Sequence, residues 1–501
     1  MSFTEPKFLV FLCAALLCYF LAPKRFRWCV LLVSSYVFYW FMGGIFALSV
    51  ITLTIFAVFF SGLWAGRLRE QNASRRMRRA PLALCLTFNF ALLFLFRYSD
   101  SLLPGFGLLL IPGISFYTFQ AAGYLVDIYR GKVKPELNPF RLALFVSFFP
   151  QLLQGPISRH SDIAADLFAC HGWDAKRARS GALHIVWGYF LKLVIADIAA
   201  VPVNTVFADY SPYGGAVILF AVLLYSFQIY ADFAGGISVA IGIAKIVGVS
   251  LPENFAQPFF ARSITDFWRR WHITLGSWLK DYLFYPLALS KPLAKLGKVS
   301  RRILGSDKGK LIPACVATFV IYMVMGIWHG VTSSAIAFGL LNNLFITTAL
   351  FNAAMIEKLR KTTHINGNGG GFGRVFATCR TFLLVIFLRY FARARTVTAA
   401  LGMLRRTVGT PYPSQLTNGT LLTLGIGLQE YIILGFAIVL LLVRDVAAER
   451  GMPRGLTAQD TLTRSHPILQ YVFLVIVLAL IAYCGIYRDG YVASEFIYAN
   501  Y

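Results

Sequence analysis

The class of fold is indicated by one stretch in which no side chain is charged, Phe46-Ala-Leu-Ser-Val-Ile-Thr-Leu-Thr-Ile-Phe-Ala-Val-Phe-Phe-Ser-Gly-Leu-Trp-Ala65. A helix rises about 1.5 Å per residue, so about 20 apolar residues cross the hydrocarbon core of a bilayer. Similar apolar runs recur on both sides of this stretch, toward both ends of the chain. The sequence therefore predicts an all-α protein that crosses a membrane many times.

Composition supports the same class. The 501 residues are 58% hydrophobic and 14% charged, whereas a soluble domain is roughly 45–50% apolar and about 25% charged. We expect a single membrane-embedded domain over 1–501, with about twelve transmembrane or re-entrant helices. The candidate spans are 8–22, 28–43, 46–65, 81–98, 113–128, 181–200, 216–234, 311–330, 333–352, 377–392, 430–443 and 468–487. Pro or Gly interrupts two more apolar stretches, 142–157 and 237–251, which we predict to be re-entrant.

The charge balance is 47 Lys and Arg against 22 Asp and Glu. Basic residues gather in short segments, as the positive-inside rule and anionic lipid favour, so membrane lipid is an expected partner and nucleic acid is not. Residues 67–79 carry six Arg and one Glu, and residues 291–310 carry seven Lys and Arg and one Asp. We therefore expect 67–79, and a basic loop near 286–310, to be cytoplasmic.

Three loops, 99–112, 201–215 and 408–429, are poor in Lys and Arg and are expected to face outward. The arginines between 389 and 406 do not fit this alternation, and an interfacial helix would account for them. The glycine-rich segment near 364–374 has neither the strand nor the helix start of a nucleotide loop, so we predict a flexible linker.

The eight cysteines include no Cys-x-x-Cys pair, and most lie in or beside apolar stretches. They are interpreted as small buried hydrophobic side chains, and neither a disulfide framework nor a metal site is expected.

His329 ends an apolar run that begins near residue 311, and it lies between Gly326 and Gly330. Ionisable side chains at membrane depth are costly and are functional candidates. A neutral imidazole is the least costly titratable base to place there, because its unperturbed pKa is about 6.5. The position predicts either a catalytic base or a structural His bonded to a neighbouring helix.

Segment 263–285 is predicted to form one amphipathic helix at the membrane interface. At about 100° per residue its apolar side chains share one stripe, which includes Trp268 and Trp271. His272 lies at the edge of this stripe. It is either a satisfied side chain of an anchoring helix or part of a site.

Asp232 lies inside the apolar stretch 216–234. A buried carboxylate needs a partner. We predict that Asp232 is buried and pairs with an Arg of 262–270, and the alternative is that it orients a catalytic His.

Several blocks then form a family pattern: Gly113-Ile-Ser-Phe-Tyr-Thr-Phe-Gln120, Phe148-Phe-Pro-Gln-Leu-Leu-Gln-Gly-Pro156, Pro252-Glu-Asn-Phe255, Asp266-Phe-Trp-Arg-Arg-Trp-His272 and Gly326-Ile-Trp-His-Gly330. Over nearly its whole length the chain resembles the membrane-bound O-acyltransferase family. The matching branch is the bacterial one that includes alginate O-acetyltransferases and the D-alanyl transfer protein of teichoic acid. The chain departs from that branch at Asn342, near which members often carry another His.

The resemblance implies helices around a central tunnel in which an intramembrane His meets both substrates. His329 would be the general base toward a hydroxyl, and His272 would position or polarise the acyl group. The donor would be acetyl-CoA or another acyl thioester from the cytoplasm, with no bound cofactor and no metal. The other expected site residues, which bind substrate or support the two histidines, are Asp232, Asn254, Trp268, Trp271 and Trp328.

The predicted function is therefore transfer of an acyl group, in the first place acetyl, toward hydroxyls of an extracytoplasmic polysaccharide. The resemblance also implies a separate SGNH-type acyltransferase as extracytoplasmic partner and a location in the bacterial cytoplasmic membrane. D-alanyl transfer to teichoic acid is one alternative. A non-enzymatic polysaccharide transporter or channel is another, although the two histidines and the lack of internal repeats in the sequence argue against it.

Overall fold

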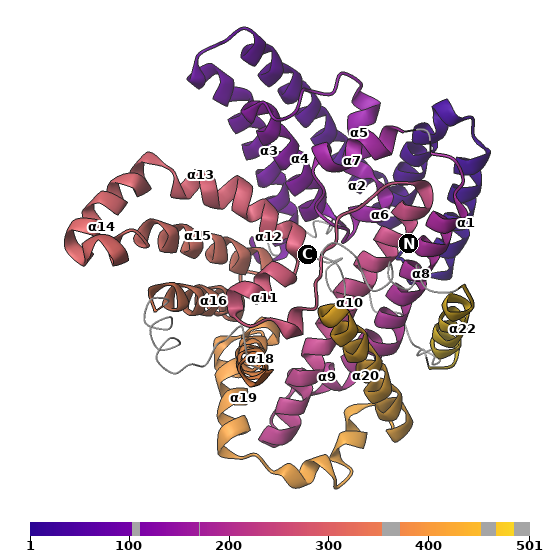
Figure 1. Ribbon diagram of the computed structural model, residues 1–501, viewed down its shortest axis with the longest axis vertical. Coiled ribbons are helices and arrows are strands. Elements are labelled where there is room, and N and C mark those ends of the chain that lie inside the picture. The colour runs from indigo at the N-terminus through magenta and orange to yellow at the C-terminus, as the bar shows by residue number, and fades with distance from the viewer. Residues whose placement is uncertain (103–110, 170, 353–370, 452–466, 485–501) are drawn as a thin grey trace. The chain divides into compact units, whose positions relative to one another are not determined.

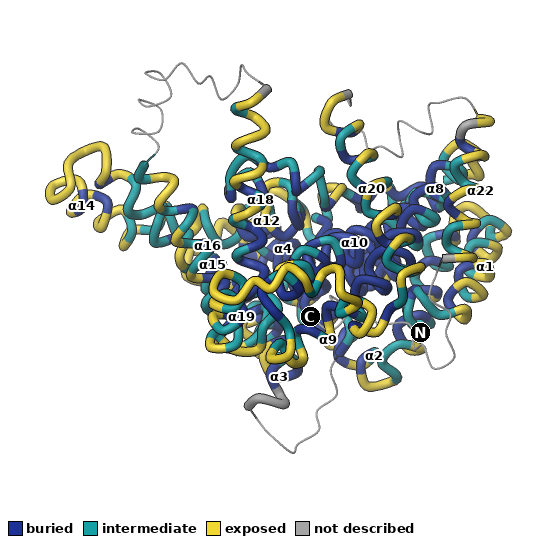
Figure 2. The backbone as a smooth tube through the Cα atoms, turned by 90° about the horizontal axis from the view of Figure 1, so that it is seen from below, coloured by how far each residue is buried: buried dark blue, intermediate teal, exposed yellow. Residues whose placement is uncertain are grey.

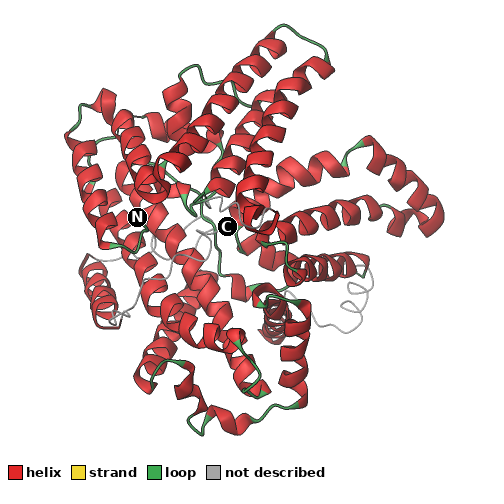
Figure 3. Ribbon diagram, turned by 180° about the vertical axis from the view of Figure 1, so that it is seen from behind, coloured by secondary structure: helices red, strands yellow, loops and turns green. Residues whose placement is uncertain are grey.

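The computed structural model describes residues 1–102, 111–169, 171–352, 371–451 and 467–484. Within these residues every regular element is a helix (Figures 1 and 3). The chain divides into two compact units. The first unit is Met1–Asp197, Tyr230–Glu253 and the described part of Met452–Tyr501, and the second is Ile198–Ile229 and the described part of Asn254–Gly451. The expectation of one domain over the whole chain stays a prediction.

The first unit consists of α1 (Pro6–Leu21), η1 (Lys24–Phe26), α2 (Arg27–Glu70), α3 (Arg75–Leu102), α4 (Ile114–Arg130), α5 (Pro139–Ser147), α6 (Phe149–Leu152), α7 (His160–Phe168), α8 (Ala175–Phe190), the π-helical turn η2 (Leu191–Ala196), the second half of α10 (Gly215–Val247) and α22 (Pro467–Cys484).

The second unit contains α9 (Asp197–Ala208), the first half of α10, η3 (Pro258–Phe260), α11 (Ile264–Arg270), α12 (Ile273–Leu279), the π-helical turn η4 (Lys280–Phe284), α13 (Tyr285–Ala288), α14 (Lys291–Gly309), α15 (Ile312–His329), α16 (Ser333–Phe351), α18 (Gly371–Arg393), α19 (Val397–Gly409), η5 (Pro413–Leu416), η6 (Thr420–Leu424) and α20 (Leu428–Gly451).

Eight helices in the described residues are long and apolar enough to cross a membrane, which confirms an all-α polytopic membrane protein. Two predicted spans, 28–43 and 46–65, belong to the single helix α2, which bends at Gly44, where φ is +65°. The predicted span 113–128 is α4, which has 17 residues and is buried on almost every face. The predicted first and last spans correspond to shorter apolar helices.

The prediction that 237–251 is a separate re-entrant piece is wrong, because α10 continues unbroken from Gly215 to Val247. Its glycines allow close helix packing rather than a break. A Cβ on Gly188 of α8 would lie 2.5 Å from the carbonyl oxygen of Gly235, and one on Gly181 would lie 2.5 Å from that of Gly242. Small residues let helix backbones approach closely in a membrane. By contrast, 142–157 is interrupted as expected, because α5 ends at Ser147 and α6 begins at Phe149.

The core of the first unit is aromatic and branched aliphatic. It brings the chain start against α2, α6 and α10 through Phe3, Phe8, Leu12, Phe38, Phe149, Leu153, Val239 and Ile243. Figure 2 shows α10 mostly buried and α14 mostly exposed.

The basic segment near 286–310 is helical rather than a loop, since it forms α14, which packs on α15 (Figure 1). Its side of the membrane stays a prediction. Of the predicted linker 364–374, residues up to 370 lie outside the described residues, and α18 begins at Gly371. The Arg-rich segment after α18 includes a separate helix, α19, which buries Ala400 and Met403.

Candidate active site

The helix predicted over 263–285 is broken at the functional position. Helix α11 ends at Arg270 and α12 begins at Ile273. Between them Trp271 is extended, and His272 has φ 48° and ψ 54°, in the left-handed region. The prediction of one continuous amphipathic helix is therefore wrong.

A short upstream segment, residues 254–256, causes the break, and we call it the strap. The backbone N–H of Ala256 donates to the carbonyl of Arg270 over 3.0 Å, and the N–H of Ile273 donates to the carbonyl of Asn254 over 3.0 Å. Phe255 and Trp271 form an antiparallel bridge between these bonds. Backbone groups near the break thus bond to the strap instead of continuing a helical ladder.

The side chain of Asn254 completes the arrangement, and it is fully buried. Its Oδ1 accepts hydrogen bonds from the backbone N–H of Thr274 (3.0 Å) and from the hydroxyl of Thr274 (2.9 Å). It also lies 3.3 Å from Nδ1 of His272. Because a backbone N–H can only donate, the Asn254 atom is the oxygen, and Nδ1 of His272 must be the donor. We therefore assign the neutral tautomer in which Nε2 is the acceptor.

His272 is 4% exposed and lies outside the candidate membrane spans. Burial, together with the nearby His329, lowers its pKa to about 3. The ring is therefore neutral at physiological pH. In this tautomer Nε2 can accept a hydrogen bond from an amide or hydroxyl, but it cannot donate one to a carbonyl. This favours positioning over polarising among the two expected roles of His272.

His329 is the last residue of α15 and is partly exposed. The ring of Trp328 neighbours both histidines, with centroids 6.4 Å from His272 and 4.8 Å from His329. The helix ends here because Gly330 has φ 149°. Close packing positions the end of α15, since a Cβ on Gly326 would lie 2.9 Å from the carbonyl of Ala335 in α16.

Of the seven predicted site residues, the second unit therefore holds six: Asn254, Trp268, Trp271, His272, Trp328 and His329.

The profile of the membrane-bound O-acyltransferase family matches residues 133–386, which is just over half of the chain. The chain belongs to the membrane-bound O-acyltransferase family. The matched range contains Asn254, His272 and His329 and thus the break, the strap and the end of α15.

Individual members of this family are also similar to the chain. A probable alginate O-acetylase of Pseudomonas aeruginosa is 34% identical over 364 residues, which cover 69% of this chain and 65% of the relative. A peptidoglycan O-acetyltransferase of Helicobacter pylori is 31% identical over 383 residues, covering 68% and 67%. A teichoic acid D-alanyltransferase of Bacillus subtilis is 30% identical over 255 residues, covering 49% and 60%. The chain thus spans about two thirds of these relatives or less.

Asn342 has a structural role that sequence reasoning missed. It is fully buried in α16, and its Oδ1 accepts a hydrogen bond of 2.9 Å from Nε1 of Trp268. Its amide nitrogen donates to the carbonyl of Phe338 over 2.7 Å. Asn342 therefore fixes the Trp268 ring, which packs edge-on against Tyr322.

Arg389 is a second residue that sequence reasoning missed. It is 5% exposed, and its guanidinium lies 4.7 Å from the ring centre of Trp271. Trp271 in turn stacks on Phe267 at 5.5 Å. The sequence contains a signal for Arg389, because an arginine inside the predicted span 377–392 needs a buried partner.

A cavity of about 430 Å³ opens beside His272. Its apolar part includes Trp268, Tyr322 and Met325, and two exposed cations, Arg269 and Lys280, also line it. His329 is not one of the lining residues. The cavity can therefore hold a partly apolar ligand that carries negative charge.

Asp232 belongs to the first unit and is 1% exposed, so its predicted burial is confirmed. The structure gives it a different cation from the predicted arginine of 262–270. Lys192 in η2 reaches Asp232 over 2.7 Å and Asp197 over 3.0 Å. The π-helical turn carries Lys192 close to Asp197 on the same segment, so one buried cation contacts two buried carboxylates.

Proposed function

We propose that this chain is an O-acyltransferase that moves an acyl group, in the first place acetyl, from a thioester donor toward hydroxyls of an extracytoplasmic polysaccharide. The observation that carries the proposal is the grouping of His272 and His329 around Trp328 in a chain of this family. Membership of an acyltransferase family also argues against a transporter or channel without chemistry.

His329 acts as the general base. It takes the proton of the acceptor hydroxyl while that oxygen attacks the thioester carbonyl. The C–O bond forms, the C–S bond breaks, and the departing thiolate takes back the proton. An alcohol needs this help because it is a weak nucleophile while protonated.

His272 positions a reactant rather than donating a proton. Its Nδ1–H is used by Asn254, and its Nε2 accepts. An amide N–H of the donor is one suitable partner, and the acceptor hydroxyl is another. The left-handed backbone of His272 and the fixed amide of Asn254 hold this acceptor in one orientation.

The cavity beside His272 suits an acyl thioester. Apolar walls accommodate the acyl chain and its linker, and Arg269 and Lys280 attract phosphate groups such as those of a coenzyme A donor. Acetyl-CoA is therefore the first donor to test, and other acyl thioesters follow.

Two of the relatives are named a probable alginate O-acetylase and a peptidoglycan O-acetyltransferase. We propose a comparable polysaccharide acceptor here, reached through a separate SGNH-type acyltransferase on the outer side of the bacterial cytoplasmic membrane. D-alanyl transfer is the second candidate, since a teichoic acid D-alanyltransferase is 30% identical over 49% of this chain.

The test is the variant His329→Ala in membranes with a labelled donor. Loss of a general base lowers turnover by at least about 10²-fold, while the amount of inserted protein stays constant. His184→Gln, which changes a buried histidine within another candidate span, is the control and retains turnover.

Labelled acetyl-CoA and a D-alanyl-loaded carrier protein are supplied in parallel, so the preferred donor identifies the acyl group. Near wild-type acylation by His329→Ala contradicts the assignment of the base. No transfer by the wild-type chain from either donor contradicts the acyltransferase proposal.

A further inference from the structure

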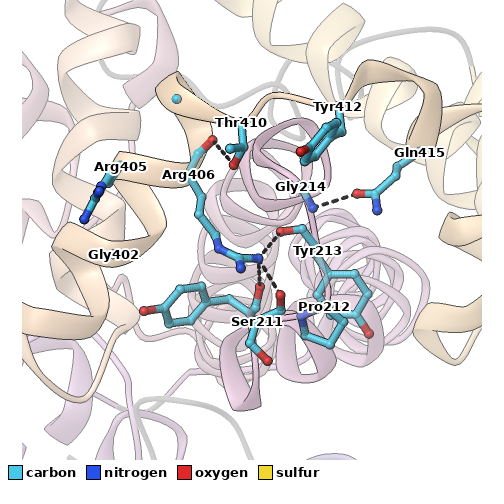
Figure 4. A pocket seen from close by; sticks show the side chains of 12 residues that line it. Ser211, Pro212, Tyr213, Gly214, Gly402, Arg405, Arg406, Thr410, Tyr412 and Gln415 are labelled. Carbon is cyan, nitrogen blue, oxygen red and sulfur yellow. Dashed lines mark hydrogen bonds between the residues drawn. The ribbon is translucent and has the colours of Figure 1, made fainter.

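A second cavity, of about 690 Å³, lies in the second unit between the loop after α9 and the end of α19 (Figure 4). Its walls come from 210–214 and from 402–415, which are distant in sequence. Most of these residues belong to the loops 201–215 and 408–429, which the sequence predicts to face outward. None of the residues assigned to acyl transfer lines it.

The two walls are tied together by the backbone. The N–H of Gly215 donates to the carbonyl of Thr410 over 2.8 Å, and the N–H of Ala216 donates to that of Pro411 over 2.7 Å. The side-chain oxygen of Gln415 accepts from the N–H of Gly214 over 2.6 Å, as Figure 4 shows. The cavity is thus a built feature with fixed walls.

Arg406 is held in place by the opposite wall. Its Nη1 donates to the carbonyls of Ser211, Tyr213 and Tyr210, the last two over 2.9 and 3.4 Å (Figure 4). Among the described residues its Nε and Nη2 have no hydrogen-bond partner. The neighbouring Arg405 is exposed and has no hydrogen bond or ion pair in the described part of the chain.

The charge of the cavity is positive. Both arginines line it, and no lining residue is acidic. Asp209 lies beside the wall and offsets one charge, because a hydrogen bond from the N–H of Ser211, with help from Arg406, lowers the pKa of its carboxyl. One positive charge remains in excess.

The rest of the lining suits a sugar. Tyr210, Tyr213 and Tyr412 provide three rings that combine an apolar body with a hydroxyl. The amide nitrogen of Gln415 is a further donor, since its oxygen is used by Gly214. Space is also available, because a Cβ on Gly409 would meet nothing within 4 Å.

We propose that this cavity binds a carboxylate-bearing sugar unit of an acidic glycan. Guanidinium groups recognise carboxylates with paired hydrogen bonds, and the tyrosine rings and the Gln415 amide contact the hydroxylated ring. Only the further statement that this glycan is the acyl acceptor rests on the proposed function. Binding itself does not.

The test uses the purified full-length chain in nanodiscs of neutral lipid. The probe is a uronic acid oligosaccharide, titrated by calorimetry without any acyl donor, beside the same oligosaccharide with its carboxyls reduced to alcohols. We expect the uronate to bind and the reduced form to bind at least tenfold more weakly. Arg405→Gln weakens uronate binding at least tenfold. Arg395→Gln, an exposed arginine outside the cavity, changes it less than twofold.

Equal binding of both oligosaccharides, or equal loss in the two variants, overturns the proposal. So does full displacement of the uronate by anionic phospholipid in the nanodisc, which would identify a lipid-phosphate site. His329→Ala is expected to bind the uronate like the wild-type chain. A chain that binds but does not transfer acyl groups therefore contradicts the proposed function alone.

Discussion

At His272 the backbone conformation and the tautomer of the ring depend on the same hydrogen bonds. A left-handed conformation costs a non-glycine residue roughly 1–2 kcal/mol. Here the backbone bond from Ile273 to Asn254 and the side-chain bonds of Asn254 offset that cost. The same bonds decide which nitrogen of His272 carries the proton.

Asn254→Ala removes the acceptor of three donors and leaves buried groups of Thr274 and His272 unsatisfied. An unsatisfied buried group costs about 1–3 kcal/mol, so we expect a lower apparent Tm in detergent and loss of acyl transfer. Thr274→Val, which removes the hydroxyl bond but keeps the backbone bond, is the matched control and loses less. Equal stability of Asn254→Ala and the wild-type chain would show that the amide does not support the break.

The pH dependence of stability follows from the depressed pKa of His272, about 3 in the fold against 6.5 for the free side chain. Below pH 6.5 the unfolded chain takes up a proton that the folded chain does not bind. Stability thus falls by roughly 1.4 kcal/mol per pH unit, or about 2 kcal/mol at pH 5. His272→Asn tolerates the left-handed backbone and does not titrate. Its Tm is expected to decline less than that of the wild-type chain between pH 7 and 5, and parallel declines would contradict the buried neutral ring.

For the helices, hydrophobic periodicity predicts the apolar faces but not the points at which a helix is interrupted. The stripe of 263–285 includes Trp268 and Trp271 whether or not the helix continues. The interruption comes from Asn254 and Phe255, which are outside the repeat. In α10 the opposite error arises, because Gly242, inside the stretch 237–251 predicted to be re-entrant, does not break the helix and instead lies against Gly181.

Helix α14 offers an element-scale test of membrane sidedness. Its seven Lys and Arg within 291–310 predict a cytoplasmic location. Ser300 is unsuitable for labelling, since it is 6% exposed and its hydroxyl bonds to the carbonyl of Gly309. Ser306 is exposed. In a cysteine-free background, Ser306→Cys should react with an impermeant maleimide in inverted vesicles only, and labelling in intact cells would place α14 outside.

For the whole molecule, composition was enough to predict an all-α polytopic membrane protein, since 58% of the residues are hydrophobic. The family motifs predicted the residues of the candidate site. The sequence alone could not predict the partners of the buried charges. Asp232 contacts Lys192, forty residues away, through helix packing that no local sequence pattern encodes. Arg389 meets Trp271 in the same way.

We expect the ion pair between Lys192 and Asp232 to affect the order in which two spans enter the membrane during biosynthesis. A Lys or Asp at the centre of a span costs roughly 2.5–3.5 kcal/mol during insertion by the translocon. The span Ala175–Ala208 carries both Lys192 and Asp197, and the second carboxylate that Lys192 contacts, Asp232, emerges only later, in Gly215–Val247. We expect the first span to wait beside the translocon and to enter lipid together with the second. In a glycosylation reporter, a nascent chain truncated before Gly215 should integrate poorly, and extension through Val247 should restore integration. Asp232→Leu should weaken that restoration, and full integration of the truncated chain would show that each span enters alone.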